Sequence, residues 1–232
     1  MTAAPKPTKL LLAAVTGGKQ DATLMFAASM LRLQTDILSN QALAVTCDVA
    51  FVDCLDDALN AVLKNGHDAV VAIDTYISFP SAFVNRFLQS GHEVVAAPHP
   101  VPGVMDWDRI ARKPLGGAEA VQFAGNVYAP AAPKRRLTDE YWACDPGLVG
   151  SKRLMCVGIR RKAVEAVAAV APVVGDRSAL CFPRMDGDRP LSADEAFLAS
   201  WGGELVLDLA SPCSILGPIA FQGSVADKES IR

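Results

Sequence analysis

Residues 55–74 read LDDALNAVLKNGHDAVVAID, and this stretch decides the fold class. In its first half, apolar residues recur at positions 55, 58, 59, 62 and 63, which is the spacing of one face of an amphipathic helix. Gly66 ends that pattern. The run from Ala69 to Ile73 is continuously apolar, as a strand covered on both faces requires. A helix that leads through a glycine into a doubly covered strand predicts a largely parallel α/β sheet.

The same alternation of elements continues toward both ends of the chain. The expected strands span 9–15, 45–52, 69–73, 94–97, 121–128, 154–159, 179–182 and 204–209, and the expected helices span 21–38, 55–63, 80–90, 161–171 and 193–201. Helices placed between successive strands predict right-handed crossovers. We therefore expect an α/β fold with a mostly parallel central sheet flanked by helices.

The composition fits one globular domain. Of the 232 residues, 51% are hydrophobic and 20% are charged, which is far from the profile of a disordered chain. We expect a flexible leader at 1–8, a single domain at 9–225 and a tail at 226–232. No apolar stretch approaches the roughly 20 residues that cross a bilayer. We therefore expect a cytoplasmic protein without a transmembrane segment, whose contact with membranes, if any, is peripheral.

The charge of the chain disfavours nucleic acid as a partner. The formal net charge is -3, so there is no global basic field to attract phosphates. Basic clusters do occur at 134–136, 152–153 and 160–162. Two interpretations stay open for them: solvated surface, or contact with phosphates or an anionic membrane. The six cysteines lack the spacing of a zinc site, so we expect them to be reduced.

Polar residues follow several of the expected strands. In an open α/β sheet, ligands bind outside the carboxyl ends of the strands. The candidates there are the glycine turn at 16–18, Asp53, and Asp74 with its neighbours to Tyr76. The glycine turn either lets a nucleotide approach the backbone or is an ordinary turn, because it lacks the spacing of a complete phosphate-binding motif. Asp74 has a similar alternative as a strand-end turn or a helix cap.

Several segments, taken in order, resemble one enzyme family. They read DAVVAIDTYISFP at 68–80, VVAAP at 94–98, MCVGIRR at 155–161, SADEAF at 192–197, GGELVLD at 202–208 and FQG at 221–223. This order resembles the small bacterial and viral GT-A-type glycosyltransferases, in which an apolar strand runs into an Asp-x-Asp motif. The resemblance spans about 9–225 and implies a GT-A-like, Rossmann-like fold, with a nucleotide-binding half at 9–98 and an acceptor half at 99–225.

The resemblance implies transfer of a sugar from a UDP- or GDP-sugar donor to a glycan, a lipid-linked acceptor or a protein. The residues that it implies in donor binding are Thr16, Gly17, Asp53, Asn60, Asp74, Tyr76, Lys152 and Arg153. Carboxylates suit the hydroxyls of the donor. Lys152 and Arg153 would offset the charge of the diphosphate.

The chain departs from the family at its metal site. Tyr76 stands where members carry the second aspartate of Asp-x-Asp, and Ile215 stands near the place of a metal-binding histidine. A phenol, with a reference pKa of about 10, is a poor ligand for Mg²⁺ or Mn²⁺. Asp74 is then the remaining metal ligand of a degenerate motif. We therefore expect transfer that is independent of metal or weakly dependent on it.

The acidic pair Asp194 and Glu195 matches the family's general base. A structural interpretation competes, because Ser192 to Glu195 also forms the Ser-x-x-Glu pattern of a helix capping box. Capping would occupy Glu195 and leave Asp194 as the better base. Two further hypotheses stay open: a GT-A-like binding or scaffolding protein without turnover, and an unrelated α/β enzyme, since a fold does not dictate a function.

Overall fold

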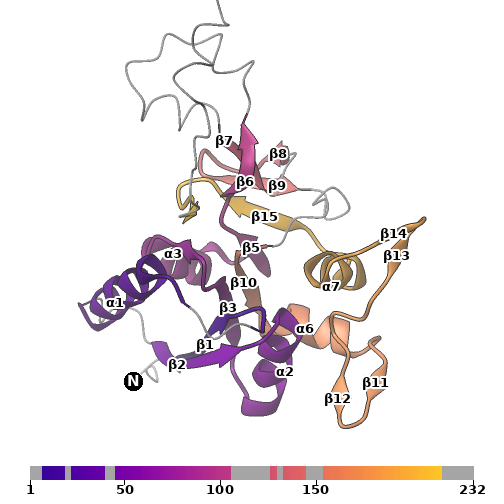
Figure 1. Cartoon of the computed structure of the whole chain (residues 1–232). Coiled ribbons are helices and arrows are strands. Elements are labelled where there is room, and N and C mark those ends of the chain that lie inside the picture. Colours follow the sequence, from indigo (N-terminus) through magenta and orange to yellow (C-terminus); the bar gives the residue numbers. More distant parts are fainter. Residues whose placement is uncertain are drawn as a thin grey trace, which may run out of the picture.

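The continuously apolar run at 69–73 forms strand β3 (Ala69–Asp74), which is buried along its whole length inside an eight-stranded sheet (Figure 1). The computed structural model describes residues 7–18, 22–39, 45–105, 126–129, 133–144 and 154–215. The predicted tail and most of the predicted leader lie outside these residues and stay predictions.

The sheet has the strand order β2-β1-β3-β10-β5-β15-β9-β8. Besides β3, its strands are β1 (Thr8–Val15), β2 (Val45–Val52), β5 (Val94–Ala96), β8 (Pro133–Arg136), β9 (Tyr141–Cys144), β10 (Cys156–Arg160) and β15 (Leu205–Asp208). β1 pairs in parallel with both β2 and β3, and β15 pairs in parallel with β5. Within this sheet, β10 and β9 run against the other strands.

Helices cover both faces of the sheet (Figure 1). On one face lie α1 (Leu24–Ser39) and α3 (Ala82–Ser90). On the other lie α2 (Leu55–Asn65), α6 (Arg161–Ala168) and α7 (Ala193–Trp201). The two cores form because successive side chains of a strand point to opposite faces. A mostly parallel sheet flanked by helices confirms the predicted fold class.

The described residues also form four two-stranded pairs. They are β4 (Ile77–Ser78) with β16 (Ser214–Ile215), β6 (His99–Met105) with β7 (Asn126–Ala129), β11 (Val173–Val174) with β12 (Arg177–Ser178), and β13 (Met185–Asp186) with β14 (Arg189–Pro190). The strand predicted at 121–128 is found as β7, and 121–125 lie outside the described residues. Among the described residues, no helix is long and apolar enough to span a membrane.

The strand predicted at 179–182 is wrong. A hydrogen bond from the Ala179 amide to the Pro172 carbonyl, 2.9 Å long, closes the β11–β12 hairpin instead. Leu180 is buried in the core between the sheet and its helices. The short apolar run therefore supplies a side chain that anchors a loop, which is a use that the sequence pattern does not distinguish from a buried strand.

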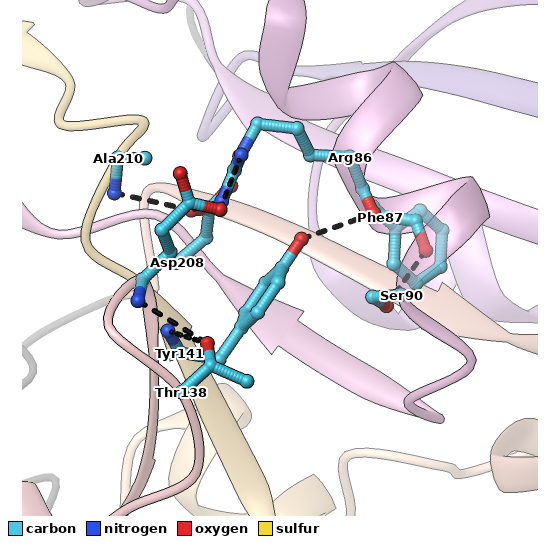
Figure 2. A network of polar contacts seen from close by, with 8 residues as sticks. Arg86, Phe87, Ser90, Thr138, Tyr141, Asp208 and Ala210 are labelled. Atoms are coloured by element: carbon cyan, nitrogen blue, oxygen red, sulfur yellow. Dashed lines mark hydrogen bonds and ion pairs between the residues drawn. The ribbon is translucent and has the colours of Figure 1, made fainter.

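A buried ion pair ties α3 to β15 (Figure 2). Asp208 is fully buried, and its two carboxylate oxygens accept bonds of 2.8 Å from Nε and Nη2 of Arg86. The guanidinium also lies 5.1 Å from the ring centre of Tyr141 and 3.0 Å from the carboxylate of Glu140. This hydrogen bonding to Asp208 raises the pKa of Arg86 further above its ordinary value, so the guanidinium stays charged.

Candidate functional site

A cavity of about 270 Å³ lies at the carboxyl ends of β1, β2 and β3. Its polar lining comes from four places that are distant in sequence: Gly17 after β1, Asp53 after β2, Asp74 at the end of β3, and Ser192 with Asp194 at the start of α7. We call it the aspartate cavity after Asp53, Asp74 and Asp194. The three carboxylates meet because parallel strands end at one edge of the sheet, where α7 also begins.

Asp74 is held firmly and still borders the aspartate cavity. Its side chain is 7% exposed, and Oδ1 accepts a bond of 2.9 Å from the Tyr76 amide. Its own amide donates to the Met155 carbonyl at 2.7 Å. The strand-end turn that was an alternative for Asp74 is therefore present, and it coexists with a place in the cavity wall. Tyr76 contributes its backbone to this turn and does not line the cavity.

The glycine turn after β1 is braced against Asp53. The Gly17 amide donates to the Asp53 carbonyl at 3.0 Å, and the Thr16 hydroxyl donates to the Asp53 carboxylate at 3.4 Å. Gly17 and Gly18 adopt φ angles of 64° and 77°, which favour glycine. Thr16 does not itself line the cavity, but it orients a carboxylate that does.

Asp194 and Glu195, the acidic pair at the start of α7, make different contacts. The capping box is confirmed: the Ser192 amide donates to the Glu195 carboxylate at 2.7 Å, and the Glu195 amide donates to the Ser192 hydroxyl. Glu195 is buried and lies outside the cavity lining. Asp194 lines the cavity, and its Oδ2 accepts a bond of 2.8 Å from the Leu154 amide.

Asn60 bonds to protein groups outside the aspartate cavity. Its amide donates to the Asp56 carbonyl, the Asp56 carboxylate and the Ser178 carbonyl, at 2.9, 3.0 and 2.9 Å. It therefore joins α2 to the β11–β12 hairpin. Lys152 and Arg153 lie outside the described residues, although Leu154, the next residue, lines the cavity.

Cys54 is a cavity residue that sequence reasoning missed. It lines the cavity directly after Asp53, and its thiol donates to the Asp57 carboxylate at 3.3 Å. Burial raises the pKa of this thiol, so the thiol form is favoured at neutral pH. Its position after the last residue of a strand was the available signal, since such positions border ligand sites in open sheets.

No group of three or more His, Cys, Asp and Glu side chains in the described part of the chain could hold a metal ion. The three aspartates of the aspartate cavity border a space of about 270 Å³. Carboxylates spread in this way suit a ligand with several hydroxyl groups. The role of Asp74 as a metal ligand stays a prediction.

The basic clusters are paired where the structure describes their side chains. The ion pairs are Arg135 with Glu204, Arg136 with Asp139, Arg161 with Glu165 and Lys162 with Glu93. Arg160 instead donates to the carbonyls of Phe87, Leu88 and His92 at the end of α3. These contacts favour the interpretation of 135–136 and 160–162 as surface and helix-capping groups over that of a phosphate-binding patch.

No protein-family model matches the chain, and no curated protein matches it. Solved structures that are similar to it include the following three. An apo UDP-glucose pyrophosphorylase is 8% identical with a TM-score of 0.42, covering 87% of this chain and 90% of its own. A putative glucose-1-phosphate thymidylyltransferase from Bacillus anthracis is 12% identical with a TM-score of 0.34, covering 71% and 76%. A mannose-1-phosphate geranyltransferase from Thermus thermophilus is 12% identical with a TM-score of 0.35, covering 90% and 76%. All three TM-scores are below 0.5, so the chemistry of this chain rests on its own site.

Proposed function

We propose that the aspartate cavity binds the sugar or nucleoside part of a nucleotide sugar, and that the chain transfers the sugar to an acceptor. The observation that carries this proposal is the meeting of Asp53, Asp74 and Asp194 around one cavity at the carboxyl edge of the sheet. Ligands of open α/β sheets bind at this edge.

The chemistry of the lining suits hydroxyl groups. An ionised carboxylate only accepts hydrogen bonds, and a ribose or hexose ring offers several donors close together. A space of about 270 Å³ is at the small end for ligand pockets, so it suits one ring system and not a whole nucleotide sugar. The rest of such a ligand would extend past the cavity mouth.

The diphosphate needs a place away from the carboxylates, because like charges repel. The described lining of the cavity contains no Lys or Arg. The Gly17 amide already donates to the Asp53 carbonyl, and the first turn of α2 carries Asp56 and Asp57, so the positive charge must come from beyond this lining. Lys152 and Arg153 stay our candidates for neutralising the leaving diphosphate. They precede the cavity residue Leu154 in the chain.

We assign Asp194 the role of the general base. A base must reach the proton of the acceptor hydroxyl, and Asp194 is the cavity carboxylate that comes from the second half of the chain. The bond from the Leu154 amide fixes one carboxylate oxygen and thereby orients the side chain. We do not assign Glu195 a catalytic role, because its carboxylate completes the capping box of α7.

The test is binding of UDP- and GDP-sugars by isothermal titration calorimetry, with and without Mn²⁺. Asp74→Asn keeps an oxygen for the Tyr76 amide but loses the charge, so it should weaken binding about tenfold or more. Asp188→Asn, on the exposed β13–β14 turn, is the matched control and should bind as the wild type does. Absence of nucleotide-sugar binding, or equal binding by both variants, would refute the proposal.

Turnover assays separate the remaining hypotheses. Release of UDP or GDP that depends on an acceptor and on Asp194 supports glycosyl transfer. Release of pyrophosphate from a nucleoside triphosphate and a sugar 1-phosphate would instead identify nucleotidyl transfer. Binding without either product would favour the scaffolding protein.

A further inference from the structure

A second and larger hollow lies between α1 and the edge strand β2, on the face of the sheet opposite α2. It measures about 770 Å³. Its floor includes the alternate residues of β2 that face α1, namely Val45, Cys47, Val49 and Phe51. Figure 1 shows α1 and β2 together at this end of the sheet. We call the hollow the β2–α1 groove.

Large apolar side chains around the groove are exposed. Val49 and Phe51 of β2 are 55% and 68% exposed, and Leu24 and Leu31 of α1 are 86% and 65% exposed. Leu24 and Leu31 lie seven residues apart, so they belong to one stripe of the helix. Contiguous apolar patches larger than a few hundred Å² are rare on monomers and mark interaction sites. Leu31, Val49 and Phe51 all line the groove, so its exposed apolar side chains gather at one place.

The strand beside the groove is an unprotected edge. β2 is the outermost strand of the sheet and, within the described residues, pairs only with β1. Its sequence, VTCDVAFV, contains no proline or lysine, the residues that commonly guard an edge. Its single charge, Asp48, bonds His67 on the face opposite the groove, at 2.8 Å. As far as the described residues go, the outer edge of β2 is therefore open to pairing with another strand.

We propose that a second copy of this chain covers the β2–α1 groove, with β2 paired to β2 across a twofold axis. In such a contact the same patch serves both partners, so each exposed strand edge finds an identical edge. An axis perpendicular to the sheet places both α1 helices on the same face. The stripe containing Leu24 and Leu31 then packs against its counterpart.

The charges and the dimensions of the patch fit self-association. α1 carries one positive and one negative side chain, Arg32 and Asp36. The single charge of β2, Asp48, is paired with Lys9 at 3.7 Å, so each copy brings no unbalanced charge to the contact. Eight residues of β2 span about 26 Å and sixteen residues of α1 span about 24 Å. A stable interface buries about 800 Å² per partner, so the contact must cover strand, helix and rim together.

The groove is independent of the aspartate cavity. The two hollows lie on opposite faces of β1, which gives Leu12 and Ala14 to the groove and Val15 to the cavity. Loss of the dimer would therefore leave nucleotide-sugar binding in place. Failure of one proposal does not imply failure of the other.

The experiment measures the mass of the full chain by sedimentation equilibrium and light scattering, from about 1 to about 100 μM. We expect twice the chain mass of 24.5 kDa. Phe51→Lys combined with Val49→Lys should weaken association at least about 100-fold, because it buries charge in an apolar contact. Val174→Lys is the matched control: this valine is 61% exposed on the β11–β12 hairpin, and its loss should leave the dimer intact.

A second readout identifies the strand involved. Amide hydrogen exchange at 45–52 should slow as the wild-type concentration rises, and should not change in the double lysine variant. A wild-type chain that is monomeric throughout, or a dimer that survives both lysines, would overturn the proposal. So would a monomer that binds phosphatidylcholine vesicles through Phe51, because the groove would then serve lipid.

Discussion

Asp208 shows what one buried charge requires of its surroundings. It is fully buried at the end of β15. Arg86 donates one hydrogen bond to each of its two carboxylate oxygens, as a bidentate pair. The Ala210 amide adds a bond of 3.1 Å. Taking a carboxylate out of water is costly, and a fitted guanidinium offsets that cost (Figure 2).

Arg86→Met should therefore destabilise the chain by about 3 kcal/mol or more, because Asp208 would be left buried without its partner. Urea unfolding followed by circular dichroism measures this loss. Arg136→Met removes an exposed partner of Asp139 and should change the free energy of unfolding by less than about 1 kcal/mol. Equal losses in the two variants would contradict the assignment.

His99 makes the stability of the chain depend on pH. It is 3% exposed, and burial lowers its pKa to about 4, whereas the unfolded residue has a pKa of about 6.5. Between these values the unfolded state binds a proton that the folded state does not. Stability should therefore fall as the pH drops from about 6.5 to about 4, and this residue's share should reach about 2 kcal/mol by pH 5.

His99→Gln removes that contribution and leaves the other titrating groups in place. The free energy of unfolding should fall less between pH 7 and pH 5 in this variant than in the wild type. If both lose stability in parallel, His99 is not the source, and the acid sensitivity belongs to other groups such as Asp48, whose pKa is lowered by its hydrogen bond with His67.

Individual site residues were predictable where their position in a strand decides their place. Asp53 and Asp74 follow strands that read clearly in the sequence, and the carboxyl ends of parallel strands share an edge. Glu195 shows the limit, because Ser-x-x-Glu carries a capping pattern and an acidic pair in the same letters. Asn60 was predicted to bind the donor, but its side chain bonds the Ser178 carbonyl. These two residues lie 118 positions apart in the sequence, so no local pattern indicates their contact.

At the level of elements, α3 packs closely against β10 because Gly158 of β10 has no side chain. A Cβ placed on Gly158 of β10 would lie 2.5 Å from the ring of Phe87 on α3. The Arg160 guanidinium lies 5.3 Å from the centre of the same ring and donates to carbonyls at the end of the helix. The glycine therefore sets how closely this helix approaches the sheet.

Gly158→Ala should destabilise the chain by about 1 to 3 kcal/mol through overpacking against Phe87. Phe87→Leu, which replaces the clashing ring with a smaller side chain, should relieve part of that cost. The double variant should then be more stable than the sum of the single losses implies, as a double-mutant cycle in urea would show. Simple additivity would mean that the two residues do not compete for the same space.

Whether a segment forms a helix or a strand was predictable from the sequence, but the direction of each strand in the sheet was not. The strands at 69–74 and 94–96 and the helix at 193–201 follow from local patterns, and Gly66 ends α2 in the left-handed conformation. The strand at 156–160 was also expected. Its antiparallel insertion between β3 and β5 was not, because strand direction depends on the path of the chain and not on local composition.

The whole molecule combines a rigid sheet with loosely attached hairpins. β3, β10 and β5 lie next to one another inside the sheet, and nearly all of their side chains are buried. The β11–β12 and β13–β14 hairpins project beside α2 and α7 (Figure 1). Their exposed apolar residues include Val173, Val174 and Met185. The start of α7, which lines the aspartate cavity, follows directly after these hairpins.

The β11–β12 hairpin makes its polar contacts with α2 at the surface, while the buried anchor of this segment, Leu180, follows the hairpin in the chain. Arg177 pairs with Asp57 across a half-exposed surface, and Asn60 holds the Ser178 carbonyl at 2.9 Å. Exposed pairs contribute little, so the hairpin should open without unfolding of the sheet. Amide exchange should be slowest at 70–73 and 157–159 and much faster at 173–178.

Asn60→Ala tests this division of the molecule. It removes the amide that bonds both Asp56 and Ser178, so exchange at 173–178 should accelerate several-fold while exchange in β3 and β10 changes little. Hydrogen exchange followed by mass spectrometry measures both regions at once. Equal acceleration in the sheet and in the hairpin would mean that the chain unfolds as one unit. Selective acceleration would instead place the cavity at the boundary between a stable sheet and a segment that opens on its own.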